Sequence, residues 1–181
     1  MFTRLPHPFP LLPLMLALLL PVGCAVQPTG IVTSQSIEVA FSPEAGAETL
    51  VVKVLASAQQ TVRLAGYSFT SPAVVKGLLD AKRRGVDVRV LLDDKGNRGA
   101  ASLLAIKMIT EANISLRVIS TYAIHHDKYI VVDSRHTETG SFNYSQAAAR
   151  AISENVPGAL EQRGRCPALF RSLGKPMEAR D

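Results

Sequence analysis

Strand-like and helix-like patterns alternate along residues 37–109, and this alternation constrains the fold more than any other feature of the sequence. Ile37, Val39 and Phe41 alternate with polar residues, as in a half-buried strand, and apolar residues then recur at helical spacing from Leu50 to Leu55. Later segments repeat this order, with strands expected at 62–69 and 86–92 and helices at 71–85 and 103–109. The alternation predicts an α/β fold with a mixed, largely parallel sheet, helices on both faces, and ligands beyond the carboxyl ends of the strands.

The helix expected at 71–85 has recognisable ends. Ser71 can cap its first turn, Pro72 suits its first helical position, and Gly85 should end it. Three basic residues, 82–84, fall in its last turn, where positive charge is favourable. A solvated helix end explains these charges better than a phosphate site does.

Composition narrows the class of protein but not its partner. The chain has 181 residues, of which 47% are hydrophobic and 19% charged, as expected for one ordinary globular domain. Its formal net charge of +5 favours polyanionic partners. Nucleic acid and anionic lipid headgroups fit this charge equally well.

The first 25 residues have the pattern of an export signal. Arg4 supplies the positive start, and the apolar stretch from Leu11 to Leu20 ends near small residues. We therefore expect residues 1–25 to be a signal peptide and the mature protein to be periplasmic or secreted. Cleavage before Cys24 would instead give a lipid-anchored protein, but Pro21 fits a lipoprotein signal poorly.

Cofactors are not expected. Of the two cysteines, Cys24 would leave with the signal, so Cys166 would stand alone and could form neither a disulfide framework nor a cysteine-based metal site. Asp93 and Asp94 lie in a turn-rich segment and are expected to end a strand rather than to bind a metal. A glycine-rich nucleotide-binding loop is also missing from the sequence.

A motif of six residues carries the chemistry. Its pattern is HxK, four residues, D, six residues and then GSxN, formed by His126, Lys128, Asp133, Gly140, Ser141 and Asn143. Residues two apart on an extended segment share a face, so the imidazole and the ammonium group can address one substrate atom. Glycine allows close backbone approach, and the hydroxyl and amide can donate to phosphate oxygens. The motif therefore predicts a phosphate-binding active site.

This motif resembles the HKD signature of the phospholipase D superfamily. Further segments resemble the small, single-motif bacterial endonucleases of that superfamily: Ala40-Phe41-Ser42-Pro43, Ala65-Gly66-Tyr67-Ser68-Phe69-Thr70, Ala81-Lys82-Arg83-Arg84-Gly85-Val86-Asp87-Val88 and Glu138-Thr139-Gly140-Ser141-Phe142-Asn143. The resemblance covers residues 37–156, and it implies a phospholipase D-like half-domain that we place at 31–156.

The resemblance implies a metal-independent hydrolysis in two steps. His126 would attack phosphorus to give a phosphohistidine, while His126 of the partner subunit would protonate the leaving oxygen. Lys128 and Asn143 would stabilise charge on the phosphoryl oxygens, and Ser141 would assist by hydrogen bonding. Because the chain has one signature and relatives with two build the site internally, a symmetric homodimer is expected.

Three neighbouring residues receive other roles. Asp133 lies an odd number of residues from His126 and should face away from the phosphate, in a structural role. Glu154 occupies the place where the resemblance implies a glutamate hydrogen-bonded to the nucleophilic histidine. His125 is expected to be a solvated neighbour rather than a catalyst.

The sequence departs from the family pattern after Val156. Pro157 and Gly158 disfavour the hydrophobic strand found in relatives, so a core strand should be missing and residues 157–181 should form an atypical tail. A frameshift near Val156 is our hypothesis for this departure. The codons CCT GGT GCT CTG GAA CAA encode residues 157–162, and reading them from the second base gives Leu-Val-Leu-Trp-Asn, which is close to the family sequence.

Three functions remain open at this stage. A non-specific endonuclease fits the single motif and the positive charge. A phospholipase D acting on phosphatidyl headgroups would use the same phosphohistidine chemistry. An inactive or binding-only remnant would follow from the altered C-terminus.

Overall fold

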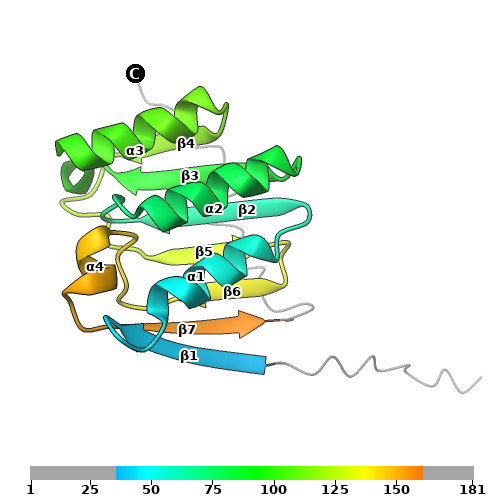
Figure 1. Ribbon diagram of the computed structural model, residues 1–181. Helices are drawn as coiled ribbons and strands as arrows, with labels where there is room; N and C mark the ends of the chain where they lie inside the picture. Colours follow the sequence, from blue (N-terminus) through cyan, green and yellow to red (C-terminus); the bar gives the residue numbers. More distant parts are fainter. Residues whose placement is uncertain (1–35, 161–181) are drawn as a thin grey trace, which may run out of the picture. The chain divides into compact units, whose positions relative to one another are not determined.

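The structure is a computed structural model, and it describes residues 36–160. These residues form one seven-stranded sheet in the order β1-β7-β6-β5-β2-β3-β4, with helices packed against it (Figure 1). The strands are β1 (Ser36–Ser42), β2 (Thr61–Gly66), β3 (Asp87–Asp93), β4 (Ser115–Ile119), β5 (Tyr129–Val132), β6 (His136–Thr139) and β7 (Glu154–Leu160). The helices are α1 (Ala47–Ala56), α2 (Pro72–Arg83), the 3₁₀ turn η1 (Lys95–Asn97), α3 (Ala100–Glu111) and α4 (Gln146–Arg150).

The α/β class and the mixed sheet are confirmed, but the sheet is not largely parallel. Within residues 36–160, β2 pairs in parallel with β3, and β3 with β4. The pairings β1–β7, β7–β6, β6–β5 and β5–β2 are all antiparallel. The expected parallel pattern holds only where a helix joins neighbouring strands, because β5 and β6 are joined by a short turn, which can connect only antiparallel strands.

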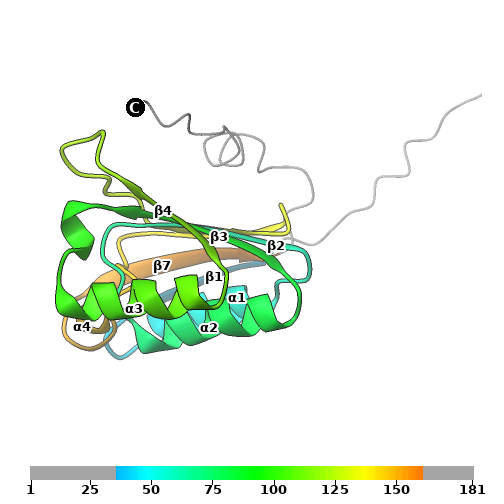
Figure 2. The same ribbon diagram turned by 90° about the horizontal axis from the view of Figure 1, so that it is seen from above.

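The expectation of helices on both faces is wrong for the described residues. Figure 2 shows α1, α2 and α3 side by side on a single face of the sheet. The crossings from β1 to β2, β3 and β4 all run in the same direction across the sheet. Because crossovers between parallel strands are almost always right-handed, steps in one direction place every helix on the same face.

The main core lies between these helices and the sheet. α2 begins as expected, since Ser71 Oγ accepts the N–H of Val74 at 3.2 Å and Pro72 is the first helical residue. The helix ends at Arg83, close to Gly85, whose φ of 86° favours glycine. Its buried side chains pack with those of α1, β2, β3 and β5, including Val51, Val54, Leu55, Val62, Leu64, Val74, Leu78, Val90, Leu92, Ile130 and Val132.

β1 is a strand as expected, but its apolar face is not the buried one. The exposed fractions of Ile37, Val39 and Phe41 are 66%, 58% and 52%. Ala40, with the opposite orientation, packs against the core beside α1. The prediction used hydrophobicity alone, whereas α1 covers the side of β1 that carries the smaller and polar residues.

The prediction that a core strand is missing after Val156 is also wrong. β7 continues through Pro157 and Gly158 and lies between β1 and β6. Its pairing with β6 joins Gly158 to Glu138 and Ala159 to Thr137, so Pro157, which pairs with Val39 of β1, lies just beyond that ladder. Pro157 thus lies beyond the β6 ladder but in the middle of the β1 ladder, so the general rule against proline in strands does not hold here.

The two terminal expectations lie outside the described residues. The export signal at 1–25, Cys24, Cys166 and the rest of the tail fall in this category, and the frameshift near Val156 stays a hypothesis. Within 36–160, none of the helices is both long enough and apolar enough to cross a membrane.

Candidate active site

The residues of the motif gather at one edge of the sheet. His126 and Lys128 directly precede β5, Ser141 and Asn143 follow β6, and Glu154 begins β7. β5 and β7 start at the edge where β2 and β3 end, because they run antiparallel to β2 and to β1. This is the edge beside α4 in Figure 1. The fold thus brings the signature residues other than Asp133 to the carboxyl ends of the parallel strands, where α/β sheets bind ligands.

His126 is exposed at this edge and rests against an aromatic ring. Its imidazole lies 4.7 Å from the ring of Tyr67, centroid to centroid, with the two planes at 63°. Tyr67 directly follows β2, so this contact positions the imidazole relative to the end of a central strand. An exposed imidazole held in this way can reach a substrate phosphorus.

Lys128 is a buried cation in the same place. Its residue is 6% exposed, its Nζ donates to the carbonyl of His126 at 3.0 Å, and Nζ lies 5.4 Å from the centre of the Tyr67 ring. Burial lowers the pKa of Lys128, while the charges of Glu154 and Asp127 act to raise it. A phosphate oxygen would supply the anionic partner that a desolvated ammonium group favours.

Fully buried side chains alternate with exposed or half-buried ones over residues 141–144. Phe142 and Tyr144 are fully buried, so Ser141 and Asn143 extend in the other direction. The N–H of Asn155 donates to Ser141 Oγ at 3.0 Å, which leaves the hydroxyl proton available for donation. Asn143 Oδ1 is buried without a hydrogen-bond partner, and because this oxygen is an acceptor, only the NH₂ group of the amide could donate to a phosphate.

Gly140 is required by its surroundings. Its φ is 140°, and a Cβ built there would lie 2.3 Å from the carbonyl oxygen of Asn155. That same carbonyl, on β7, accepts the N–H of Ser141 at 3.2 Å, so a backbone hydrogen bond fixes the start of the segment to β7. A side chain at this position would push the segment away from β7.

Asp133 lies at the other end of β5 from the signature histidine. Its carboxylate accepts the N–H groups of Gln59, Gln60 and Thr61 at 2.7 to 2.8 Å. It therefore joins the end of β5 to the connection between α1 and β2, which is a structural task.

Glu154 does not make the expected hydrogen bond to His126. Among the described residues, no hydrogen bond or ion pair joins these two side chains. Glu154 acts instead on Lys128, because its charge raises the pKa of that ammonium group. The position of Glu154 in the sequence could not reveal this difference, which depends on how β7 lies in the sheet relative to β5.

His125 is not the solvated neighbour that was expected. It is 8% exposed, its Nε2 is buried without a partner, and its Nδ1 lies 3.6 Å from a carboxylate oxygen of Asp127. Its backbone N–H donates to Asp93 Oδ1 at 2.7 Å. Asp93 is 32 residues away, so no local pattern around His125 predicts this burial.

Three residues that support the site were missed by sequence reasoning. Asp93 accepts the N–H of Gly96 and of His125, and so joins the turn after β3 to the segment that carries His126. Asn97 donates to the carbonyls of Tyr67 and Asp93 at 2.7 and 2.8 Å. Tyr67, Asp93 and Asn97 all follow or end β2 and β3, and that position was the available signal.

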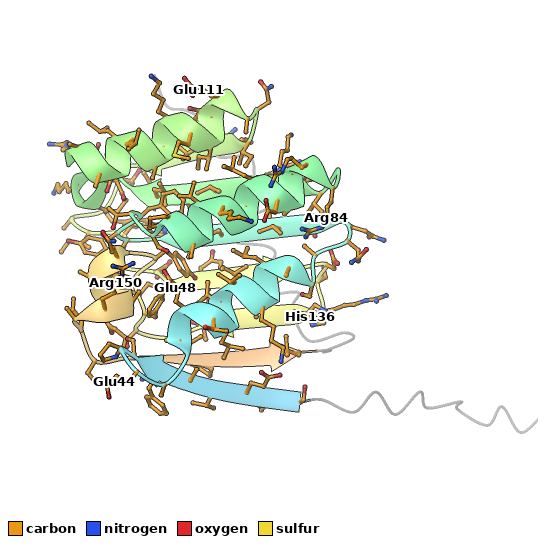
Figure 3. All side chains as sticks on the ribbon, in the orientation of Figure 1. Glu44, Glu48, Arg84, Glu111, His136 and Arg150 are labelled. Carbon is orange, nitrogen blue, oxygen red and sulfur yellow. The ribbon has the colours of Figure 1, made fainter. Side chains whose placement is uncertain are left out.

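The basic residues at the end of α2 lie away from this edge. Figure 3 shows Arg84 at the end of the molecule opposite Arg150 of α4. The guanidinium group of Arg84 donates to the carbonyls of Leu55, Ala56 and Ala58, and Arg83 pairs with Asp80. These contacts describe a helix end rather than a phosphate site. Within the part of the chain that the structure describes, no cluster of His, Cys, Asp and Glu could hold a metal ion.

Comparison with known proteins decides the family. The family model described as "Cardiolipin synthase, PLD-like domain" matches residues 51–157, which include the complete signature. The chain belongs to the phospholipase D superfamily. A solved phospholipase D family member, Nuc from Salmonella typhimurium, is 42% identical, with a TM-score of 0.71 over 77% of this chain and 89% of that one. The similarity therefore covers most of the Nuc structure.

Curated relatives in the phospholipase D superfamily carry lipid-related names. "Phospholipase D" of Rickettsia typhi is 30% identical over 122 residues, which is 67% of this chain and 59% of that protein. "Mitochondrial cardiolipin hydrolase" of Xenopus laevis is 33% identical over 107 residues, or 59% of this chain and 50% of that protein. The chain thus spans little more than half the length of these relatives.

Proposed function

We propose that this chain is a metal-independent phosphodiesterase that cleaves nucleic acid without sequence preference and works as a homodimer. The observation that carries the proposal is that the exposed imidazole of His126 and the buried ammonium group of Lys128 both lie against the ring of Tyr67. A nucleophile next to a desolvated cation suits attack on a phosphodiester, because the cation offsets the negative charge on the phosphoryl oxygens.

The reaction has two balanced steps. A nitrogen of His126 bonds to phosphorus, the bond from phosphorus to the leaving oxygen breaks, and that oxygen takes a proton from His126 of the partner subunit. Water then gives a proton back to the same partner imidazole and attacks phosphorus, and the phosphorus–nitrogen bond breaks. Lys128 and the amide of Asn143 stabilise the phosphoryl oxygens throughout, and Ser141 donates its hydroxyl proton to one of them. Glu154 favours the charged form of Lys128.

Two considerations favour nucleic acid as the substrate. The formal net charge of +5 suits a polyanion, and the solved phospholipase D family member Nuc is 42% identical to this chain. The test is cleavage of single- and double-stranded DNA in excess EDTA by the purified protein. We expect cleavage by the wild type and a loss of at least about 10³-fold in His126→Asn. His125→Asn is the matched control, and equal losses in both variants would contradict the assignment of the nucleophile.

The homodimer has its own test. Each site needs two signature histidines, so wild-type protein is mixed with excess His126→Asn and left to exchange subunits. If the site is shared, activity per wild-type subunit falls toward zero, because nearly every wild-type subunit then has an inactive partner. Constant activity per wild-type subunit would mean that each chain acts alone.

Phospholipid hydrolysis is the second candidate. The segment between β4 and β5 rises from the sheet on the side away from α1–α3, and it carries the exposed side chains of Tyr122 and Ile124 close to His126 (Figure 2). An aromatic and an aliphatic side chain at the rim suit a lipid surface. Hydrolysis of phosphatidylcholine vesicles without cleavage of DNA would favour this candidate, whereas no activity in either assay would favour an inactive or binding-only remnant.

We further propose export to the periplasm or medium, on the pattern of residues 1–25, with lipid anchoring at Cys24 as the less favoured form.

A further inference from the structure

Glu138 is a buried carboxyl group that the proposed reaction does not use. It lies on β6 with its side chain toward the helices, and none of it is exposed to solvent. Its Oε2 is 2.7 Å from the hydroxyl of Tyr144, whose side chain is also fully buried, and its Oε1 has no hydrogen-bond partner. The residues beside it in the sheet are Ile130 and Gly158, which offer no charge.

These surroundings favour the uncharged carboxyl group. Burial raises the pKa of Glu138 to about 8, against an ordinary value of 4.5, although the Tyr144 hydroxyl acts to lower it. The ionisable groups on neighbouring elements have other partners or positions. On α1, Lys53 pairs with Glu38, and Glu48 accepts a hydrogen bond from Ser71. Glu154 of β7 acts to raise the pKa of Lys128, and Tyr129 of β5 acts to raise the pKa of Tyr144. His136 lies on β6, the same strand as Glu138. A carboxylate at this position would therefore be poorly compensated.

Tyr144 links this carboxyl group to the catalytic segment. Its backbone carbonyl accepts the N–H groups of Thr70 and Ser71 at 2.8 and 2.9 Å, where the chain enters α2. Its ring packs so closely on β2 that a Cβ at Gly66 would lie 3.1 Å from it. The four residues 140–143 are thus held between two fixed points, β6 at one end and Tyr144 at the other.

We propose that uncharged Glu138 is a positioning residue, which through Tyr144 holds Ser141 and Asn143 at the depth where they meet the phosphoryl oxygens. This inference rests on the proposed phosphodiesterase function. Loss of the proton would place an uncompensated carboxylate beneath the segment and favour its displacement toward water. The site would then carry an internal limit on activity at alkaline pH, separate from the titration of the histidines.

The test is the pH dependence of kcat/KM for DNA in wild type and in Glu138→Gln. Glutamine has the shape of the uncharged carboxyl group and can accept from Tyr144, but it cannot ionise. Above pH 8, we expect the activity of the wild type to fall more steeply than that of Glu138→Gln, by about a further tenfold per pH unit. Glu111→Gln, an exposed glutamate at the end of α3, is the matched control and should follow the wild type (Figure 3). The proposal would be overturned if kcat/KM fell with the same steepness above pH 8 in all three proteins.

A second measurement does not depend on activity. A carboxyl group whose pKa is raised on folding stabilises the protein fully below its unfolded pKa of 4.5, and this stability is lost as pH rises toward 8. The melting temperature of the wild type should therefore fall over this range relative to that of Glu138→Gln. If the protein shows this difference in melting but has no activity, the proposed function is contradicted, whereas the uncharged state of buried Glu138 is supported. Equal pH dependence of melting would contradict the uncharged state itself.

Discussion

Single residues in the proposed site combine an expected catalytic role with a cost to folding. Lys128 is the clearest case, because its ammonium group is buried and its pKa is lowered by that burial. Its Nζ donates to one backbone carbonyl and faces the Tyr67 ring, which compensates the lost hydration incompletely. Function and stability should therefore respond in opposite directions when this charge is removed.

Lys128→Met tests this opposition. The substitution keeps an unbranched apolar side chain and removes the charge, so we expect phosphodiesterase activity to fall by about 10³-fold or more. The melting temperature should stay level or rise, since methionine fills the space without desolvation cost. Both quantities are measured on the same preparation, with Lys107→Met, an exposed lysine of α3, as the control. A large loss of stability in Lys128→Met would show that the ammonium group stabilises the fold.

Gly140 offers a second test at this scale. Gly140→Ala places a Cβ 2.3 Å from the carbonyl of Asn155 and keeps a φ of 140°, so we expect it to destabilise the protein by about 2 kcal/mol or more and to reduce kcat. Gly99→Ala is the matched control, because a Cβ there meets nothing within 4 Å. Chemical denaturation measures both variants, and equal stabilities would contradict the close contact with β7.

At the scale of elements, the short strands β5 and β6 determine where the signature lies. Their connection uses positive φ at Asp133 and Ser134, which places the carboxylate of Asp133 against three backbone N–H groups. Burial acts to raise the pKa of Asp133, but the N–H groups of Thr61, Gln59 and Gln60 outweigh it and lower the pKa. The turn thereby fixes β5 against the connection from α1 to β2.

Asp133→Asn should weaken this attachment. Loss of charge-assisted hydrogen bonds from three donors should lower the free energy of unfolding by about 2 kcal/mol, with little change in kcat for the protein that remains folded. Because the pKa of Asp133 is lowered on folding, the difference from wild type should be present above pH 3.8, the unfolded value, and shrink as pH falls below it. Urea denaturation at pH 7 and at pH 3 checks this. An unchanged difference at the two pH values would exclude the carboxylate as the cause.

Local sequence predicted elements better than their arrangement. Ser71 and Pro72 marked the start of α2 correctly, since capping depends on neighbouring residues alone. The hairpin of β5 and β6 was missed because Asp133 and Ser134 adopt positive φ without a glycine, which is the usual signal. The continuation of β7 through Pro157 was missed because the rule against proline in strands takes no account of the neighbouring strands. The ladder between β6 and β7 ends at Gly158, so it does not include Pro157. The buried position of His125 depends on Asp93, a contact that no local pattern contains.

On the scale of the whole molecule, the net charge and the exposed apolar residues of β1 matter most. The formal net charge of +5 belongs to the complete sequence and acts at a distance. Among the described residues, the face away from α1–α3 presents Ile37, Val39 and Phe41 to solvent. The positive charge therefore offers the clearest means of separating a polyanionic substrate from a neutral one.

Salt dependence tests this distinction. If nucleic acid is the substrate, kcat/KM for DNA should fall by about tenfold or more between 50 and 200 mM salt, because bound counterions are released on association. Turnover of zwitterionic phosphatidylcholine should change far less over the same range. Parallel titrations of both substrates make the comparison. DNA cleavage that is indifferent to salt would contradict electrostatic recognition of a polyanion.

The most direct test of the central claim is isolation of the covalent intermediate. The protein is mixed rapidly with end-labelled DNA in EDTA, quenched under alkaline conditions that preserve phosphohistidine, digested, and mapped by mass spectrometry. The account predicts a phosphoryl adduct on the peptide that carries His126, and its loss in His126→Asn. Rapid DNA cleavage without any such adduct, or an adduct on a different residue, would contradict it.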